Sequence, residues 1–333
     1  MQIAGRTGTL VLALCALLVA ALPVAADGYY LQLASTALVA AMLALSLQLL
    51  VGGTGLVSLG HAAFFGIGAY TVRFLGLAGG PPSVLLSLPA SALLAGLAAF
   101  VVGALALRTR GFYFLMTTLA FGQMLFYLYH DTPLGGGADG VFLTRPTFSA
   151  FGFDYAPRRR DLPAAMLYAN LAVLVAMYGG LALLLRTLFG RALLGISANE
   201  HRMRALGFDT YGLKLGAFTL AGALAGVAGH MFAMTEAFVN PELLGWHRSA
   251  EALLAILLGG LGALHGAILG AFAFVGLGEA AGLLTERKRL VEGLVILIVV
   301  IALPRGLIGL KLPSLRSRQR PRQDTVAPEE TAS

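Results

Sequence analysis

The sequence predicts an all-α polytopic membrane protein with about ten transmembrane or broken helices. Of its 333 residues, 58% are hydrophobic and only 12% are charged, and the mean hydropathy is +0.83. Soluble domains carry roughly 25% charged residues, so most of this chain needs lipid as its solvent. The 43 glycines suit membrane helices, whose backbones pack closely.

Apolar segments divide the chain, and each is close to or above the roughly 20 residues that cross a bilayer. They cover 9–25, 31–51, 56–77, 84–107, 112–129, 162–185, 213–238, 250–284 and 290–310. Segment 250–284 is too long for one helix and is interrupted by GGLGALHG, which predicts two shorter helices or a broken hairpin. The first segment has features of a cleaved leader, but we favour a retained helix because another apolar segment follows at once.

The basic residues predict the orientation in the membrane. With the amino terminus inside and six helices before Arg186, the basic clusters at 108–110 and 186–214 and the basic tail all fall on the cytoplasmic side. Arginines 158–160 fall outside, in a long polar loop over 131–162 that is predicted to be extracytoplasmic. Residues 311–333 are predicted to form a disordered cytoplasmic tail. The net charge of +7 therefore indicates membrane orientation and not a nucleic-acid surface.

The polar segment 186–214 contains a predicted short surface helix. In the sequence SANE, Ser197 and Glu200 have the spacing of a capping box, which predicts a helix that begins at Ala198. Gly207 follows the helix and suits a left-handed C-cap. This amphipathic helix is either a solvated connector that touches lipid headgroups or a docking element for a soluble partner. The residues expected to take part are Ser197, Glu200, Arg202, Met203, Arg204, Ala205, Leu206 and Gly207.

A second glycine-rich segment, GGTGLVSLGHAAFFGIGAY at 52–70, has two further interpretations that fail. A dinucleotide loop that starts at Gly53 would need a third glycine where Ser58 stands, and a short strand before it. A metal site at His61 would need at least two more ligands nearby, and none is present. We therefore predict a close-packed, irregular membrane segment, in which His61 packs or lines a pathway. Candidate pathway or packing residues are Gly53, Gly55, Ser58, Gly60, His61, Gly259, Gly260 and Gly262.

Several motifs resemble the permeases of ABC importers of the branched-chain amino acid type. They are LSLQLLVGGTGLVSLGHAAFFGIGAYT, TRGFYFLMTTLAFGQM, GGGADGV, GRALLGISANEHRMRALGFDTYGLKLGAFTLAGALAGVAGHMFA, AILLGGLGALHGAILGAF and ALPRGLIGL. They occur in the family's order from about Leu45 to Leu310 and look most like the LivM type of the LivH/LivM family. The chain departs from the family pattern at Gln48, where asparagine is common, and at Arg204, where glutamate is frequent.

The resemblance implies a type II ABC importer-like permease over residues 1–310, in the bacterial inner membrane, with a coupling loop at 186–214. It implies four partners: a LivH-type sister permease, two ATP-binding subunits and an extracytoplasmic solute-binding protein. The chain has no G-x-x-x-x-G-K-[ST] sequence, so ATP would be hydrolysed by the partner subunits. We expect no cofactor or metal on this chain, no enzymatic activity of its own, and contacts to membrane lipid but not to nucleic acid.

Other functions remain as alternatives. Urea and amide permeases share these motifs, and the sequence shows no charged pair placed to hold an α-amino acid. Glu251 and Glu279 bracket the broken segment and could mark an ion-coupled secondary transporter, although both are predicted to lie at helix ends near water. A membrane-embedded enzyme would need a cluster of catalytic side chains, which is absent from the sequence. The series Gly222 and Gly226, and Gly262, Gly266 and Gly270, predicts close helix packing.

Overall fold

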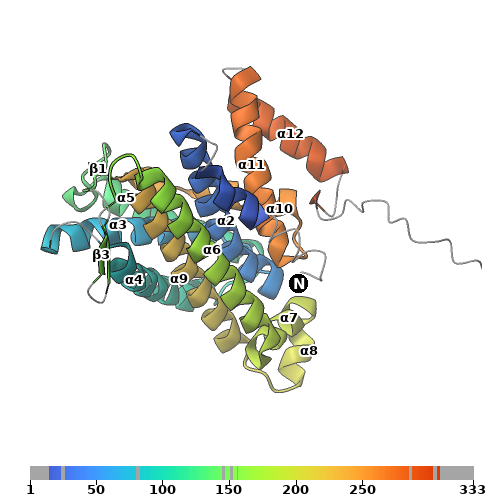
Figure 1. Cartoon of the computed structure of the whole chain (residues 1–333). Helices are drawn as coiled ribbons and strands as arrows, with labels where there is room; N and C mark the ends of the chain where they lie inside the picture. Colours follow the sequence, from blue (N-terminus) through green and yellow to red (C-terminus); the bar gives the residue numbers. More distant parts are fainter. Residues whose placement is uncertain are drawn as a thin grey trace, which may run out of the picture.

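The computed structural model describes residues 15–23, 27–79, 83–144, 147–150, 153–155, 157–284, 287–302 and 306–307. The all-α prediction is confirmed. Within these residues six helices are long and apolar enough to cross a membrane. They are α2 (Gly28–Thr54), α4 (Val84–Ala106), α5 (Phe112–His130), α6 (Leu162–Arg186), α9 (Thr210–Glu236) and α11 (Leu264–Leu284). Figure 1 shows them packed together, with α7 (Leu188–Ala198) and α8 (Glu200–Ala205) at one end.

Further elements complete the bundle. They are α3 (His61–Gly79), α10 (Trp246–Gly259), α12 (Lys288–Ala302) and two short 3₁₀ helices, η1 (Pro133–Gly135) and η2 (Pro241–Leu244). Two antiparallel pairs join β1 (Val141–Phe142) to β4 (Phe238–Val239), and β2 (Phe148–Ala150) to β3 (Phe153–Tyr155). Residues 15–23 are helical, and the Tyr168 hydroxyl donates to the Ala20 carbonyl at 3.1 Å. The predicted disordered tail at 311–333 lies outside the described residues.

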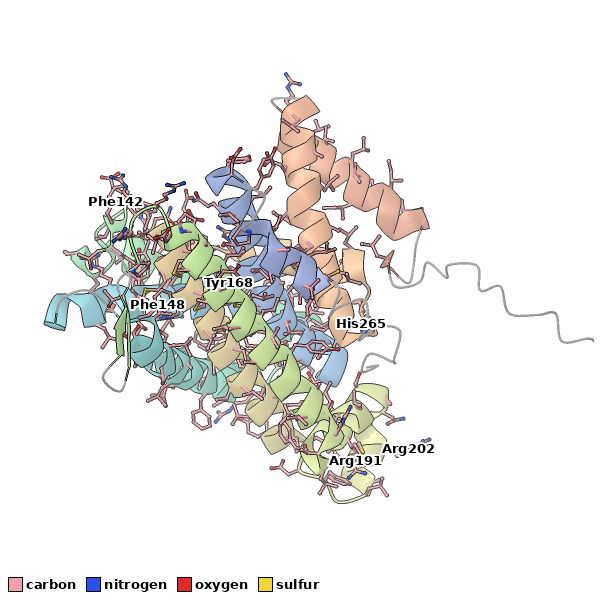
Figure 2. All side chains as sticks on the ribbon, in the orientation of Figure 1. Phe142, Phe148, Tyr168, Arg191, Arg202 and His265 are labelled. Atoms are coloured by element: carbon pink, nitrogen blue, oxygen red, sulfur yellow. The ribbon has the colours of Figure 1, made fainter. Side chains whose placement is uncertain are left out.

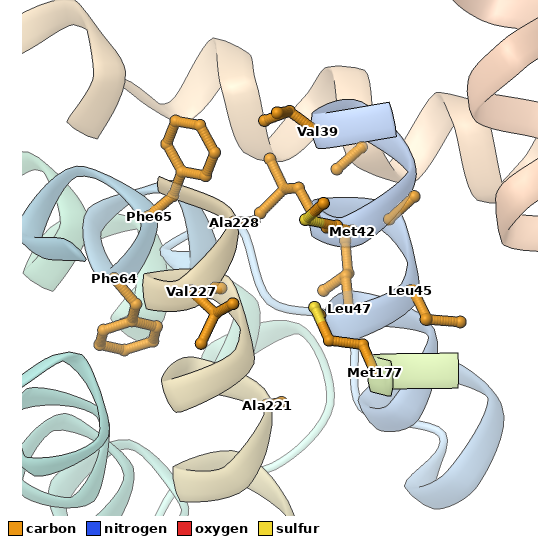
Figure 3. Close-up of a cluster of buried hydrophobic side chains, with 14 of the residues drawn as sticks. Val39, Met42, Leu45, Leu47, Phe64, Phe65, Met177, Ala221, Val227 and Ala228 are labelled. Atoms are coloured by element: carbon orange, nitrogen blue, oxygen red, sulfur yellow. The ribbon is translucent and has the colours of Figure 1, made fainter. Parts of the chain in front are cut away.

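Helix α9 lies at the centre of the bundle. Helices α2, α3 and α4 pack against it, and Figure 3 shows Met42 of α2 and Phe64 of α3 on opposite sides of the segment of α9 that carries Val227. Small residues let the neighbours approach: a Cβ added at Gly222 would lie 2.2 Å from the Ala99 Cβ on α4, and one at Gly226 would lie 2.3 Å from the Ala95 Cβ. The predicted packing role of this glycine pair is confirmed.

The predicted apolar segment 56–77 is not one helix. Gly55 ends α2 in the left-handed region at φ 74°, and residues 55–60 are irregular before α3 begins at His61. The last of these residues, Gly60, lies against α5, because a Cβ there would lie 2.2 Å from the Thr118 carbonyl oxygen. Only glycine lets the two backbones come this close. Gly52 and Gly53, in contrast, lie inside α2.

The predicted break in segment 250–284 is confirmed, and it produces a hairpin. Helices α10 and α11 run antiparallel: a Cβ on Gly259 would lie 1.9 Å from the Gly266 carbonyl oxygen, and one on Gly270 would lie 1.9 Å from the Ala255 carbonyl oxygen. The expected series of three glycines is wrong at Gly262, which lies exposed in the turn with nothing within 4 Å of an added Cβ. Helix α10 has 14 residues, about 21 Å, which is too short to cross a bilayer.

Candidate functional site

The first candidate site is the arm formed by α7, α8 and the turn into α9, residues 188–209. The Thr187 hydroxyl caps α7 by accepting from the Gly190 amide at 3.3 Å. Helix α7 buries Leu193 and Ile196 against the bundle, whereas α8 buries no residue. Figure 2 shows Arg191 and Arg202 at this end of the molecule, far from Phe142 at the other end. The arm therefore presents an exposed, arginine-rich surface on one end of the bundle.

The predicted capping box is wrong. Ser197 lies in the last turn of α7, and α8 begins at Glu200 and not at Ala198. Asn199 caps α8 instead: its backbone is extended (φ −162°, ψ 100°) and its Oδ1 accepts from the Arg202 amide at 2.9 Å. Asparagine is as good an N-cap as serine, so Asn199 was an equally strong signal in the sequence. The extended backbone at Asn199 splits the predicted helix into two.

Glu200 ties α8 to the first turns of α9. Its carboxylate accepts from the Lys214 ammonium at 2.5 Å and from the Arg204 guanidinium. The Thr210 hydroxyl donates to the same carboxylate at 3.3 Å and accepts from the Arg204 Nε at 3.0 Å. Burial raises the pKa of the Glu200 carboxyl, but the Lys214 and Arg204 charges lower it more, so this pKa lies below its ordinary value of 4.5.

The remaining predicted arm residues divide into an inner and an outer set. Met203 points inward, because a Cβ added at Gly195 on α7 would lie 2.6 Å from its sulfur. Leu206 is 67% exposed, and His201, Arg202, Ala205 and Gly207 are exposed too. Gly207 has φ 87°, and the Phe208 amide donates to the Met203 carbonyl at 3.1 Å. This arrangement is a Schellman C-cap, as the sequence predicted for Gly207.

The tip of the α10–α11 hairpin contains the second group of predicted residues. The Gln48 amide on α2 donates to the Leu261 carbonyl at 2.7 Å and to the Ala263 carbonyl at 3.4 Å. These bonds satisfy carbonyls that the broken helix leaves free. Gly260 takes φ 117° at the turn. Gln48, which departs from the family pattern, therefore holds the tip against α2.

His61 is fully buried at the start of α3. The Ser46 hydroxyl donates to the Leu43 carbonyl at 2.7 Å, so the 3.0 Å contact between Ser46 and the His61 Nε2 makes that nitrogen the donor. The imidazole also stands edge-on to the Phe64 ring at 5.9 Å. The His61 Nδ1 is buried and has no partner among the described residues, so whether His61 packs or lines a pathway stays a prediction. Ser58 is buried nearby in the chain, and its hydroxyl has no partner among the described residues. Gly53 is also buried.

A third site was not predicted from the sequence. Arg248 and Glu251, on consecutive turns of α10, form an ion pair at 3.4 Å, and the Arg248 guanidinium lies 5.3 Å from the centroid of the Phe232 ring on α9. Both side chains line a small cavity whose other walls come from α2, α3, α9 and α11. Glu251 lies in the first two turns of α10 and its side chain is exposed, as predicted, and together with Arg248 it forms a charged pair that faces an apolar cavity. Glu279 lies in the last two turns of α11 and accepts from the Tyr29 hydroxyl at 2.5 Å.

The described part of the chain holds no group of three or more histidine, cysteine, aspartate or glutamate side chains that could bind a metal. The described residues form six helices long and apolar enough to cross a membrane, the α10–α11 hairpin, an exposed basic arm at one end and a charged cavity between helices. These features define a membrane transport subunit.

The comparisons identify the family. Residues 29–303 match the family described as branched-chain amino acid transport system, permease component, and the chain belongs to this family. It is 32% identical over 305 residues to the high-affinity branched-chain amino acid transport system permease protein LivM of Escherichia coli K12, covering 86% of this chain and 71% of that protein. The chain is thus a multi-pass permease of the inner membrane.

Two more distant relatives mark the range of the family. LivH of Escherichia coli K12 is 30% identical over 138 residues, which are 39% of this chain and 44% of that protein. The autoinducer 2 import system permease protein LsrC of Escherichia coli O157:H7 is 32% identical over 155 residues, 44% of this chain and 45% of that protein. No solved structure gave a significant match.

Proposed function

We propose that this chain is one of two permease subunits of an ABC importer for branched-chain or related aliphatic amino acids. The second permease is of LivH type, two separate subunits bind and hydrolyse ATP, and an extracytoplasmic protein delivers the solute. This chain binds no cofactor or metal of its own. The likeness to LivM over 86% of the chain supports the amino-acid class over urea or amides.

The observation that carries the coupling role is the attachment of α8 to α9. Glu200 joins the exposed helix to Lys214 and Thr210, and α9 is the central helix of the core (Figure 3). A force applied to the arm by an ATPase subunit therefore reaches the helix that contacts most of the bundle. Alternating access follows when the ATPase pair closes. The closing moves α8, and α9 then shifts against α3 and α4.

Gly207 provides a specific test of this role. Its φ is 87° and nothing lies within 4 Å of an added Cβ, so a substitution there strains the backbone without a steric clash. Valine at this position costs about 1 to 2 kcal/mol or more, whereas asparagine tolerates the left-handed region. In the importer reconstituted from this chain and its four partners, we expect Gly207→Val to lose leucine uptake while keeping ATP hydrolysis, and Gly207→Asn to retain both.

Two outcomes would contradict the proposal. Normal uptake by a well-expressed Gly207→Val complex would remove the arm from coupling. Uptake by the permease alone, driven by a pH gradient in the absence of the ATPase subunits, would favour the ion-coupled secondary transporter instead.

A further inference from the structure

The cavity beside α10 combines one charged pair with apolar walls. Arg248 and Glu251 supply the charges, and Val39, Leu43, Phe65 and Phe274 are among the side chains that supply the apolar surface. These residues come from α2, α3, α10 and α11. Figure 3 shows Val39 and Phe65 along the same edge of the buried core. The charged and apolar parts therefore face a common space within the helix bundle.

The cavity lies partway along α2, and it opens on the surface of this chain where Glu251 is exposed. On α2 its wall runs from Thr36 to Leu43, about 12 to 22 Å along the helix from Gly28 at 1.5 Å per residue. The start of α10 is held at this depth, because the buried Ser249 hydroxyl accepts from the Ala62 amide at 2.8 Å. Placing an arginine and a glutamate at such a depth in a membrane has a high free-energy cost, and membrane proteins retain such residues where they line a pathway or bind a ligand.

The charged pair is open to a further partner. The Arg248 and Glu251 side chains are 36% and 47% exposed, and their contact is long at 3.4 Å. Only one guanidinium nitrogen, Nη1, takes part in it. A bidentate arginine–carboxylate pair would be shorter and would use two parallel bonds. Arg248 therefore retains unused hydrogen-bond donors, and Glu251 retains unused acceptor positions. Together they could bind a molecule that carries both a negative and a positive charge.

We propose that this cavity is a transient binding site for a zwitterionic aliphatic α-amino acid within the translocation pathway. The cavity has a volume of only about 70 Å³, whereas one of about 150 Å³ is needed to hold benzene, so the solute binds in a state in which α10 has moved away from α2. In that state the α-carboxylate binds the Arg248 guanidinium, the α-ammonium binds the Glu251 carboxylate, and the side chain lies among Val39, Leu43, Phe65 and Phe274. The inference rests on the proposed function, and it names the solute-contacting residues of that function.

A second polar group marks the route toward the site. Next to Thr36, the Glu236 carboxylate at the end of α9 accepts from the Gln32 amide at 3.0 Å and from the Thr36 hydroxyl at 3.5 Å. Thr36 lines the cavity itself. Polar groups therefore continue from Arg248 and Glu251 toward the first turns of α2. The ammonium group of a solute would find the Glu236 carboxylate at one end of this short path and the Glu251 carboxylate at the other.

The site is tested by protection of a thiol in the whole reconstituted importer. In a Cys15→Ser background, Thr36→Cys places the chain's single thiol on the cavity wall, where a water-soluble methanethiosulfonate reagent can label it. We expect saturating leucine to slow labelling, while leucinol, which lacks the carboxylate, and 4-methylpentanoate, which lacks the ammonium group, give no protection. Adding Arg248→Gln or Glu251→Gln should abolish the protection by leucine.

Uptake assays give the second measurement. Arg248→Gln and Glu251→Gln should each lower leucine uptake at a fixed low concentration by roughly 10- to 100-fold, as expected for the loss of one charged hydrogen bond. The control is Arg159→Gln, in the exposed turn before α6, which should leave uptake unchanged. Co-purification of the sister permease separates a binding role from an assembly role.

The outcomes distinguish this site from the proposed function. Leucine uptake by the unaltered complex together with full uptake by both charge variants would overturn the site alone. Loss of the sister permease from the variant complexes, with protection by leucine unchanged, would also overturn it, because the pair would then serve the subunit interface. Absence of ATP-driven leucine uptake by the unaltered complex would instead overturn the proposed function.

Discussion

Replacing Glu200 with glutamine should detach α8 from α9 without removing any hydrophobic contact. The substitution keeps the shape of the side chain but removes the charge that Lys214 and Arg204 share. Lys214 is only 14% exposed, so its ammonium would lose its partner in a partly dry position. The Arg204 contact is a helical i,i+4 pair and is worth about 0.3 to 0.5 kcal/mol.

The magnitude follows from these contacts. A partly buried, charge-assisted hydrogen bond is worth about 1.5 kcal/mol or somewhat less after screening, so the total cost is about 1 to 2 kcal/mol. That is a roughly 5- to 30-fold rise in the population with α8 detached. We expect faster amide hydrogen exchange in α8 by this factor, with exchange in the core of α9 unchanged, and a lower ratio of uptake to ATP hydrolysis.

The same contacts predict a pH dependence. The Glu200 pKa is lower in the folded chain than its ordinary value of 4.5, so the stabilisation is present above that value and is lost as the pH falls through the folded pKa. Protection of α8 should therefore decrease under acid conditions in the unaltered chain and stay flat in Glu200→Gln. Equal protection of α8 in the two chains at pH 7 would refute the role of this carboxylate.

Two further substitutions test the packing of the bundle. Gly226→Ala would place a Cβ 2.3 Å from that of Ala95 and should destabilise the detergent-solubilised protein by about 1 to 3 kcal/mol. The control is Gly180→Ala, at an exposed position on α6 with nothing within 4 Å of an added Cβ, which should leave the melting temperature unchanged or raise it. Equal melting temperatures for the Gly226→Ala and unaltered proteins would contradict the close contact. His61→Ala should lower the free energy of unfolding by about 2 to 4 kcal/mol and leave the KM for leucine unchanged. Ser46→Ala and the double variant complete a double-mutant cycle for the contact between the two side chains. A changed KM at unchanged stability would instead make His61 a solute contact.

The sequence was most informative where the signal is local. Apolar length predicted the helical class, and the glycines of GGLGALHG predicted the break between α10 and α11 because a 35-residue segment cannot be one membrane span. The conformation of Gly207 followed from its place after a short helix. Ser197 shows the limit of such signals: Ser197 and Asn199, two positions apart, were equally good caps, and only the extended backbone at Asn199 decides between them.

The charged cavity could not be predicted because its walls come from five separate helices. Arg248 and Glu251 are one helical turn apart, which by itself predicts only a surface pair. The surroundings of Arg248 and Glu251 depend on the depth at which η2 and Ser249 place α10 within the bundle. They depend also on Phe232 and Thr36, which are distant in sequence. The same applies to Gln48, whose partners at the hairpin tip lie more than 200 residues away.

Helix α9 joins the two proposed sites. Lys214 near its first residue is held by Glu200, and Phe232 near its last residue stacks on Arg248; the 18 positions between them span about 27 Å. Between these ends the backbone of α9 is in close contact with two helices at Gly226. A Cβ added at Gly68 of α3 would lie 2.0 Å from the Gly226 carbonyl oxygen, and a Cβ added at Gly226 would lie 2.3 Å from the Ala95 Cβ of α4. Small residues meet small residues at this level, but nearer its first residue α9 inserts Phe218 between Phe64 of α3 and Phe114 of α5, so we expect α9 to shift only together with these rings. A movement of α8 would then change the distance between Phe232 and Arg248, which is the change a site needs in order to bind and release a solute.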